Sequence, residues 1–229
     1  MDGDADLATP ARLMGEPARA AMLVALLDGR SLPASELAAI AGVKAPTASA
    51  HLAQLVAGGL VTDRRVGRHR YFTLAGPEVA DAVEALQRIA PRQAVRSYRQ
   101  SAAAERLAEA RSCYDHLAGR TALRLADALV AEGSLSPLEA GETGRILDVD
   151  GALAATLHLR AVDPDGRRPA VRGCLDWTER RPHLGGSVGA ALAQRCFDLD
   201  WLKRMRESRA LTLTPAGRRG LSKTFGVTL

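Results

Sequence analysis

Aromatic residues are scarce in this 229-residue sequence, which holds three phenylalanines, three tyrosines and two tryptophans. They make up 3% of the chain, whereas hydrophobic residues make up 47%. The core must therefore be built mostly from alanine, leucine and valine. Such a composition favours closely packed helices over sheets. The composition therefore indicates a mainly α fold.

Cysteine and long hydrophobic runs are also scarce. Three cysteines are few for a secreted disulfide scaffold, and an odd number cannot all pair within the chain. No apolar run reaches the length needed to cross a bilayer. Residues 1–6 are acidic, whereas a signal peptide begins with basic residues followed by an apolar stretch. These absences predict a reduced, cytoplasmic protein with no membrane partner.

The positive charge is modest, with a net charge of +5 and a pI of about 9.5. That value is compatible with a nucleic-acid partner but does not establish one. The distribution is more informative, because residues 62–72 carry four arginines against a single acid, Asp63.

Residues 16–91 show an ordered series of helix and strand signals. Glu16-Pro17 begins a helix that Asp28-Gly29 ends, Pro33 begins a short helix to Ile40, and a third helix follows a tight turn at 41–43. Alternating strand patterns at 60–66 and 68–74 flank Gly67, and a last helix runs from Pro77 until Pro91. Helix, short helix, turn, helix and hairpin is the order of a winged helix-turn-helix, which gives the mainly α fold small β wings.

This order predicts binding to double-stranded DNA. The third helix, at 45–57, would enter the major groove while the basic hairpin reaches the flanking backbone. Val43, Ala48, Leu52 and Leu55 should face inward, and His51 should pack against the helix rather than read a base. A solvated basic surface is the alternative for the hairpin alone, but its place after a helix-turn-helix favours DNA. The expected DNA contacts are Lys44, Pro46, Thr47, Ser49, Ala50 and Gln54 on the helix, and Arg64, Arg65, Arg68 and Arg70 on the hairpin.

The stretch from Glu16 to Leu74 resembles the ArsR/SmtB-type repressors. Their pattern S-x-x-T-x-S-x-H-L is matched by Thr47, Ser49, His51 and Leu52, and their charged wing by residues 64–71. The sequence departs from the pattern at Lys44, which stands where the family commonly has a capping serine. The resemblance implies a homodimeric repressor that leaves its operator in response to a ligand, a metal or a thiol-reactive signal.

The rest of the chain resembles a longer subgroup of these regulators with a C-terminal domain. The motifs that carry this resemblance are CYDHLAG at 113–119 and CLDWTERRPHLGG at 174–186. We expect a winged helix-turn-helix and dimerisation domain at 1–92 and a mostly helical sensor domain at 93–229, beginning with a helix at 93–111.

A weak internal repeat relates two parts of the second domain at an offset of 67 residues, which aligns His116-Leu117-Ala118-Gly119 with His183-Leu184-Gly185-Gly186. The expected units are about 113–150 and 180–229. Only the second shows a strand, at 209–214, before its last helix. In this alignment Cys113 stands opposite Arg180. Cys196 stands opposite Leu129, which suggests that Cys196 is a small buried apolar residue. Residues 176–181 could line a pocket, although a surface turn held by an ion pair is favoured.

The usual metal sites of the family are missing, because 35–40 has no cysteine and 78–89 has no histidine. Cys113, His116, Cys174 and His183 remain as candidate metal ligands, since thiolates and imidazoles bind zinc or copper and thiolates bind arsenite. The favoured alternative is structural, with each histidine making a hydrogen bond at a helix start. No cofactor is therefore assigned beyond a possible metal ion. Cys113 is the candidate sensor thiol, because an adjacent imidazolium would lower its pKa.

Two other classes of function remain open at this point. The chain could be an enzyme with Cys113 and His116 as nucleophile and base, or a module that uses its winged helix only for assembly. Neither a third catalytic group nor a phosphate-binding loop supports an enzyme, and clustered arginines argue against pure assembly. We therefore predict a DNA-binding regulator that is not an enzyme. Its dimer contacts should come from the helices before Glu16 and after Pro77, through Leu7, Leu13, Val79, Val83, Leu86 and Ile89.

Overall fold

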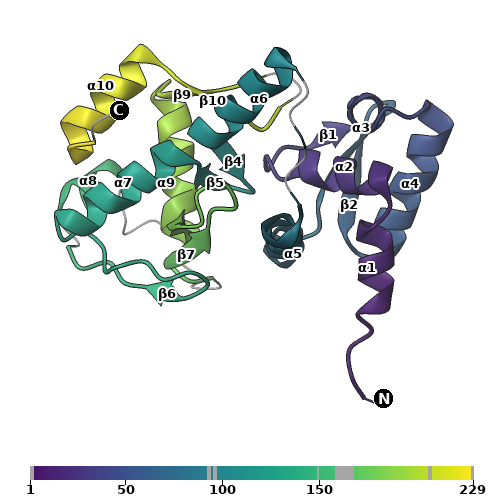
Figure 1. Ribbon diagram of the computed structural model, residues 1–229, viewed down its shortest axis with the longest axis horizontal. Coiled ribbons are helices and arrows are strands. Elements are labelled where there is room, and N and C mark those ends of the chain that lie inside the picture. Colours follow the sequence, from purple (N-terminus) through teal and green to yellow (C-terminus); the bar gives the residue numbers. More distant parts are fainter. Residues whose placement is uncertain are drawn as a thin grey trace. The chain divides into compact units, whose positions relative to one another are not determined.

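The computed structural model of the chain describes residues 3–91, 94, 97–148, 150–157, 168–205 and 208–227. The chain divides into two compact units, Met1–Pro91 and Arg92–Leu229 (Figure 1). Each unit has its own buried apolar residues, and each is described by itself.

The N-terminal unit is a winged helix-turn-helix, as the sequence predicts (Figure 1). Its three strands form one antiparallel sheet in the order β1-β3-β2. Strand β1 has two residues and was not predicted, because it is defined only by its pairing with β3. In chain order the elements are α1 (Ala8–Met14), α2 (Pro17–Leu26), β1 (Leu32–Pro33), α3 (Ala34–Ala41), α4 (Ala45–Ala57), β2 (Val61–Val66), β3 (His69–Leu74) and α5 (Pro77–Ile89).

Local signals explain where these elements begin and end. The Glu16 carboxylate accepts a hydrogen bond from the Arg19 backbone N–H and caps α2. Gly42 ends α3 in the left-handed conformation, and Gly67 adopts φ +59° in the two-residue turn between β2 and β3. The predicted apolar stripe of α2 is fully buried, at Met22, Leu23, Leu26 and Leu27.

The C-terminal unit combines helices with short hairpins (Figure 1). The helix predicted at 93–111 appears as α6 but ends earlier, because Arg111 begins a strand; residues 93, 95 and 96 lie outside the described part. The predicted strand at 209–214 appears as β10. The elements are α6 (Tyr98–Glu109), β4 (Arg111–Cys113), β5 (His116–Ala118), α7 (Arg120–Ala131), β6 (Thr143–Gly144), α8 (Ala152–Leu157), β7 (Val171–Leu175), β8 (Pro182–Gly185), α9 (Gly186–Asp198), β9 (Leu202–Arg204), β10 (Leu211–Leu213) and α10 (Pro215–Phe225).

The internal repeat has a structural counterpart in paired residues. The bridge between Leu135 and Ile146 recurs 67 residues later as the pair Leu202 and Leu213. The first unit therefore keeps a single bridge where the sequence analysis expected no strand pairing. Within the two expected repeat units, residues 149, 206, 207, 228 and 229 lie outside the described part.

The offset changes at the first hairpin of each unit. Cys113 pairs with His116 across β4–β5, and Cys174 pairs with His183 across β7–β8, so the stretch between cysteine and histidine is longer by six residues in the second hairpin. The counterpart of Cys113 is therefore Cys174, and the expectation of Arg180 was wrong. The second unit accordingly begins with β7 at Val171, before the expected residue 180.

The two repeat units interlock. Thr143 of the first unit pairs with Arg172 of the second, and Ala210 of the second bridges to Arg111 of the first. Within the C-terminal unit, α9 packs on β5 and α7 packs on β8. Neither repeat unit is thus a separate domain, because each completes its pairing with strands of the other.

Gly119 and Gly186 explain the glycine of the repeated His-Leu-x-Gly motif. Both adopt positive φ, +88° and +80°, immediately before or at the start of a helix. A Cβ atom would lie 2.7 Å from the Ala108 carbonyl oxygen at Gly119, and 2.5 Å from the Ala170 carbonyl oxygen at Gly186. Only glycine fits such a backbone with so close a neighbour.

Candidate nucleic-acid interface and a Cys/His cluster

Helix α4 presents the side chains that the sequence assigned to DNA. Ala48, Leu52 and Leu55 are buried, and Val43 is half-buried. The outward positions are exposed, and they lie mainly at the N-terminal half of the helix, where a recognition helix meets base edges. They are Lys44, Pro46, Thr47, Ser49 and Ala50. Lys44 is the N-cap residue and its side chain makes no capping bond, which leaves the ammonium available for a phosphate.

Gln54 has a different environment from the one predicted. Its Oε1 accepts a hydrogen bond of 2.6 Å from Arg19 Nη1. Arg19 is buried and also donates to the backbone carbonyls of Leu13 and Arg12. Reading adenine through two bonds needs both ends of the amide, and the acceptor end is already engaged. In the DNA-free chain Gln54 therefore links Arg19 of α2 to α4, and its contact with a base stays a prediction.

The hairpin β2–β3 carries the predicted arginines on its surface. Arg64, Arg65, Arg68 and Arg70 are all exposed. Arg70 differs from the others, because its Nε lies 2.7 Å from the Asp63 carboxylate and its guanidinium lies over the Phe72 ring. The hydrogen bond with Asp63 raises the pKa of Arg70 further above neutrality. Arg70 is thus partly neutralised within the hairpin.

His51 packs as the sequence predicts. The ring is half-buried, and its Nδ1 lies 3.6 Å from the Glu16 carboxylate that caps α2. The imidazole therefore lies between α4 and the start of α2 rather than on the outward face of the recognition helix.

The candidate dimer residues divide into two groups. Leu7, Leu86 and Ile89 are exposed by 77%, 46% and 80% of their surface. Val83 is buried within the unit, so its assignment to a dimer contact was wrong, and Leu13 and Val79 are half-buried. The apolar surface that remains lies before α1 and toward the end of α5.

In the C-terminal unit the structure brings together four residues that are far apart in sequence. We call Cys113, His116, Cys174 and His183 the Cys/His cluster. One potential ligand atom from each residue lies within 4.8 Å of all the others, and the two sulfur atoms are 3.8 Å apart. All three cysteines of the chain carry thiols, and Cys196 lies apart in the core, where burial raises its pKa to about 12.

Each histidine of the cluster turns one nitrogen toward a carboxylate. His116 Nδ1 lies 3.2 Å from Asp115, and His183 Nδ1 lies 3.7 Å from Asp176. His116 Nε2 and both ring nitrogens of His183 are buried without a hydrogen-bond partner among the described residues, so the approach of His183 to Asp176 is an ion-pair distance and not a hydrogen bond. The expected hydrogen bond from each histidine to a helix start was wrong for α7, because the Gly119 N–H donates to Asp176 instead.

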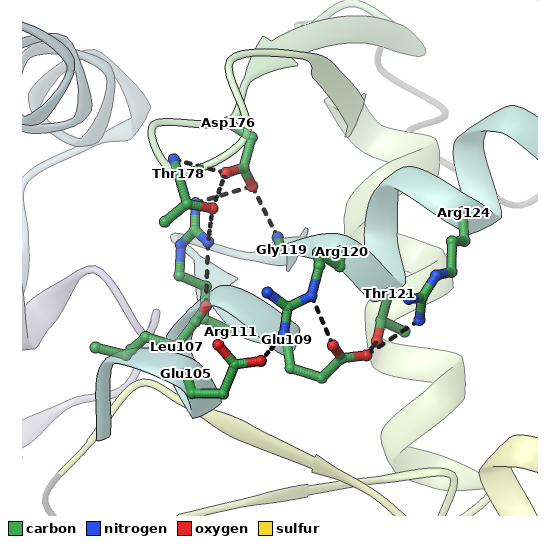
Figure 2. Close-up of polar contacts among 10 residues, drawn as sticks. All are labelled: Glu105, Leu107, Glu109, Arg111, Gly119, Arg120, Thr121, Arg124, Asp176 and Thr178. Atoms are coloured by element: carbon green, nitrogen blue, oxygen red, sulfur yellow. Dashed lines mark hydrogen bonds and ion pairs between the residues drawn. The ribbon is translucent and has the colours of Figure 1, made fainter. Parts of the chain in front are cut away.

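Asp176 joins the two hairpins (Figure 2). Its carboxylate forms an ion pair of 2.9 Å with Arg111 and accepts hydrogen bonds from Gly119 N–H and the Thr178 hydroxyl. Arg111 and Asp176 are both fully buried, so the turn at 176–181 is held by a buried ion pair rather than by the expected surface pair. Burial raises the pKa of Asp176, but Arg111 and these hydrogen bonds outweigh it and hold the pKa well below the usual value.

A second polar group lies beside it at the start of α7 (Figure 2). Glu109 accepts from the Arg120 and Arg124 guanidinium groups and from the Thr121 hydroxyl, and Arg120 also bonds Glu105. These contacts attach α6 to α7. Asp115, Asp176 and Arg111 were not among the predicted site residues; the one available signal was the position of Asp115 beside His116.

The environment of the cluster shifts the pKa values of Cys174 and His116. The hydrogen bond with Cys113 and the neighbouring imidazoles lower the pKa of Cys174, against the effect of burial. Burial lowers the pKa of His116, but the neighbouring Asp115 and Cys174 outweigh this and raise the pKa to about 9. The Cys174 sulfur and the His116 ring therefore each favour the charged form of the other.

Comparison with known proteins shows similarity over the full length. Residues 14–64 match a family described as a helix-turn-helix domain. The HTH-type transcriptional regulator YdfF of Bacillus subtilis (strain 168) is 37% identical over 224 residues, which cover 97% of this chain and 98% of YdfF. The similarity to YdfF thus includes the C-terminal unit.

Several solved structures are similar over part of the chain. The transcriptional repressor BigR from Xylella fastidiosa is 30% identical and covers 38% of this chain and 89% of its own, with a TM-score of 0.35. The cadmium metal-sensor CMTR from Mycobacterium tuberculosis is 33% identical and covers 40% of this chain and 99% of its own, with a TM-score of 0.32. Among the described residues, no helix is both long enough and apolar enough to span a membrane.

Proposed function

Because this chain belongs to the HTH-type transcriptional regulators, which act on DNA, we propose that it is a dimeric repressor of the ArsR type. It acts in the cytoplasm, where it binds a two-fold symmetric operator and releases it when an effector reaches the C-terminal unit. The longer C-terminal domain with the motifs at 113–119 and 174–186 defines the subgroup.

The observation that carries DNA recognition is the exposed surface of α4 and the hairpin β2–β3. Small and polar side chains cover the first turns of α4, so its backbone can approach base edges closely. Arg64, Arg65 and Arg68 extend this surface with positive charge that can neutralise phosphates. The helix therefore supplies sequence preference, and the hairpin supplies affinity.

The size of this surface supports a second copy of the chain. A single α4 reads only a few base pairs, whereas two α4 helices related by a two-fold axis contact successive major grooves roughly 34 Å apart. The exposed Leu7, Leu86 and Ile89 offer apolar surface for that contact.

A gel-shift titration with DNA from the region upstream of its own gene tests the proposal. We expect a discrete complex that unrelated competitor DNA displaces only poorly. In vitro transcription from the same fragment should fall when the protein is added. Absence of any preference for this DNA over unrelated fragments, or activation instead of repression, would contradict the proposal.

Two variants separate base reading from helix anchoring. Thr47→Ala should change the preferred sequence, at a cost of about 1–3 kcal/mol for a lost base contact. Gln54→Ala should instead lower the stability of the N-terminal unit, because Arg19 loses its partner, while the sequence preference of the folded protein stays the same. A change of preference in Gln54→Ala would show that Gln54 also contacts a base.

A further inference from the structure

We propose that the Cys/His cluster is a closed, four-coordinate site for a zinc ion, which fastens the two repeat units of the C-terminal unit to each other. This inference rests on the geometry of that unit and is independent of DNA binding. Each repeat contributes one sulfur and one nitrogen ligand, from a cysteine and a histidine that face each other across a hairpin.

The spacing of the ligand atoms fits a tetrahedral ion. Zinc–sulfur bonds of about 2.3 Å place two sulfur ligands of a tetrahedron about 3.8 Å apart. The Sγ atoms of Cys113 and Cys174 are 3.8 Å apart. The largest separation in the cluster, 4.8 Å, involves a ring nitrogen and exceeds a tetrahedral edge to nitrogen, about 3.3–3.6 Å, by about 1.2–1.5 Å, which rotation of an imidazole can close.

The orientation of the two histidines supports coordination. Histidines that bind metals commonly donate their second ring N–H to a carboxylate, which fixes the ring and its tautomer. Asp115 and Asp176 occupy that position behind His116 and His183, at 3.2 Å and 3.7 Å from Nδ1. For His116 this leaves Nε2 as the ligand atom. For His183, whose two nitrogens both lack a hydrogen-bond partner among the described residues, the carboxylate beside Nδ1 favours Nε2.

The donor set and its burial select the ion. Two sulfurs and two nitrogens in a tetrahedron are typical of zinc, whereas calcium and magnesium prefer oxygen. Four protein ligands leave no open position for water or substrate, so the site is structural rather than catalytic. Cys113, His116 and His183 are exposed by only 2%, 8% and 0%, which is consistent with an ion held inside the fold.

The position of the site explains why an ion would matter. Polar contacts between the two hairpins include those of Asp176 with the Gly119 N–H and with Arg111. Zinc bound by both hairpins would hold β5 beside β8 and so support the packing of α7 and α9 on them.

Metal analysis of the full-length protein, purified after growth with added zinc, tests the site. We expect about one zinc ion per chain, and protein produced with cobalt should show the thiolate charge-transfer and strong ligand-field absorption of tetrahedral Co²⁺. Cys113→Ser and His183→Gln should each reduce bound zinc at least tenfold. Cys196→Ala is the matched control, because it removes a buried cysteine outside the cluster and should leave the zinc content unchanged.

Several outcomes would overturn the proposal. They are parent protein without stoichiometric zinc, an octahedral cobalt spectrum, and a Cys113–Cys174 disulfide in protein purified without oxygen. Equal zinc loss in Cys196→Ala would point to general unfolding instead of ligand loss. If the cluster variants do not fold, the zinc content and cobalt spectrum of the parent protein still decide the question.

Discussion

Arg111 and Asp176 show how much can depend on a single pair of side chains. Both are fully buried, and Asp176 also accepts the backbone N–H at the start of α7. Removing one member of a buried pair leaves the other charge without compensation, which is far more destabilising than breaking a surface pair. The pair lies between the two hairpins that also supply the Cys/His cluster.

Asp176→Asn should therefore destabilise the C-terminal unit by about 3–5 kcal/mol, because Arg111 stays buried without its counter-charge. Both tryptophans of the chain, Trp177 and Trp201, lie in this unit, so denaturant titration followed by tryptophan fluorescence reports on it selectively. Asp127→Asn is the control, since Asp127 pairs with Arg181 at a site where both side chains are 56% exposed. Its effect should stay within about 1 kcal/mol, and equal losses in the two variants would contradict a special role for the buried pair.

At the scale of elements, the hairpin β2–β3 combines arginines of two kinds. Arg64 is exposed and should act on phosphates of any sequence. Arg70 is paired with Asp63 and stacked on Phe72, so less of its charge is available to DNA. Arg64 and Arg70 thus carry the same formal charge but should contribute differently to DNA binding.

Arg64→Ala should weaken binding to all DNA sequences alike and lower the slope of log K against log salt by about one. Arg70→Ala should lower that slope by clearly less, because its charge is already partly compensated by Asp63. Gel shifts over a series of salt concentrations measure both slopes. Asp63→Ala serves as the opposite control and should strengthen binding, and equal slopes for the two arginine variants would show that the Asp63 pair opens on DNA.

The elements also show which parts of the structure local sequence determines. The helices and the hairpin of the N-terminal unit follow from caps, glycine turns and apolar periodicity, which act over a few residues. Strand β1 was missed because it exists only through its partner β3, some 40 residues later. The role of Gln54 depends on Arg19, which lies 35 residues away.

The Cys/His cluster depends both on local sequence, which identifies its residues, and on contacts between distant segments, which bring them together. Its four residues were recognisable as candidates, but their convergence depends on how two hairpins pack, and an alignment without gaps hid the correspondence of Cys113 and Cys174. The six extra residues lie between Cys174 and His183, at the loop end of the hairpin, where an insertion leaves the pairing of these two residues intact. Patterns of cysteine and histidine across a hairpin would have revealed the match if loop length had been allowed to vary.

At the scale of the whole molecule, the two units differ in what their surfaces leave exposed. The described residues of the C-terminal unit bury most of their large apolar side chains, although Leu147 and Tyr98 are exposed. In the N-terminal unit the exposed Leu7, Leu86 and Ile89 lie in or next to the helices α1 and α5, which carry none of the predicted DNA contacts. Apolar surface of this kind, set apart from the basic surface, is suited to a second copy of the chain.

Ile89→Glu should shift the protein from dimer to monomer, because a charge would have to be buried at the apolar contact. Sedimentation velocity at micromolar concentration measures the shift, and the variant should also lose most of its affinity for the operator, since one α4 contacts only one half-site. Leu147→Glu is the matched control: it places the same charge on an exposed leucine of the C-terminal unit and should leave both the dimer and DNA binding unchanged. A parent protein that sediments as a monomer would contradict the dimer itself. A dimeric Ile89→Glu variant would show that the two copies meet elsewhere, and because operator binding needs only the spacing of the two α4 helices, its affinity for DNA would then be retained.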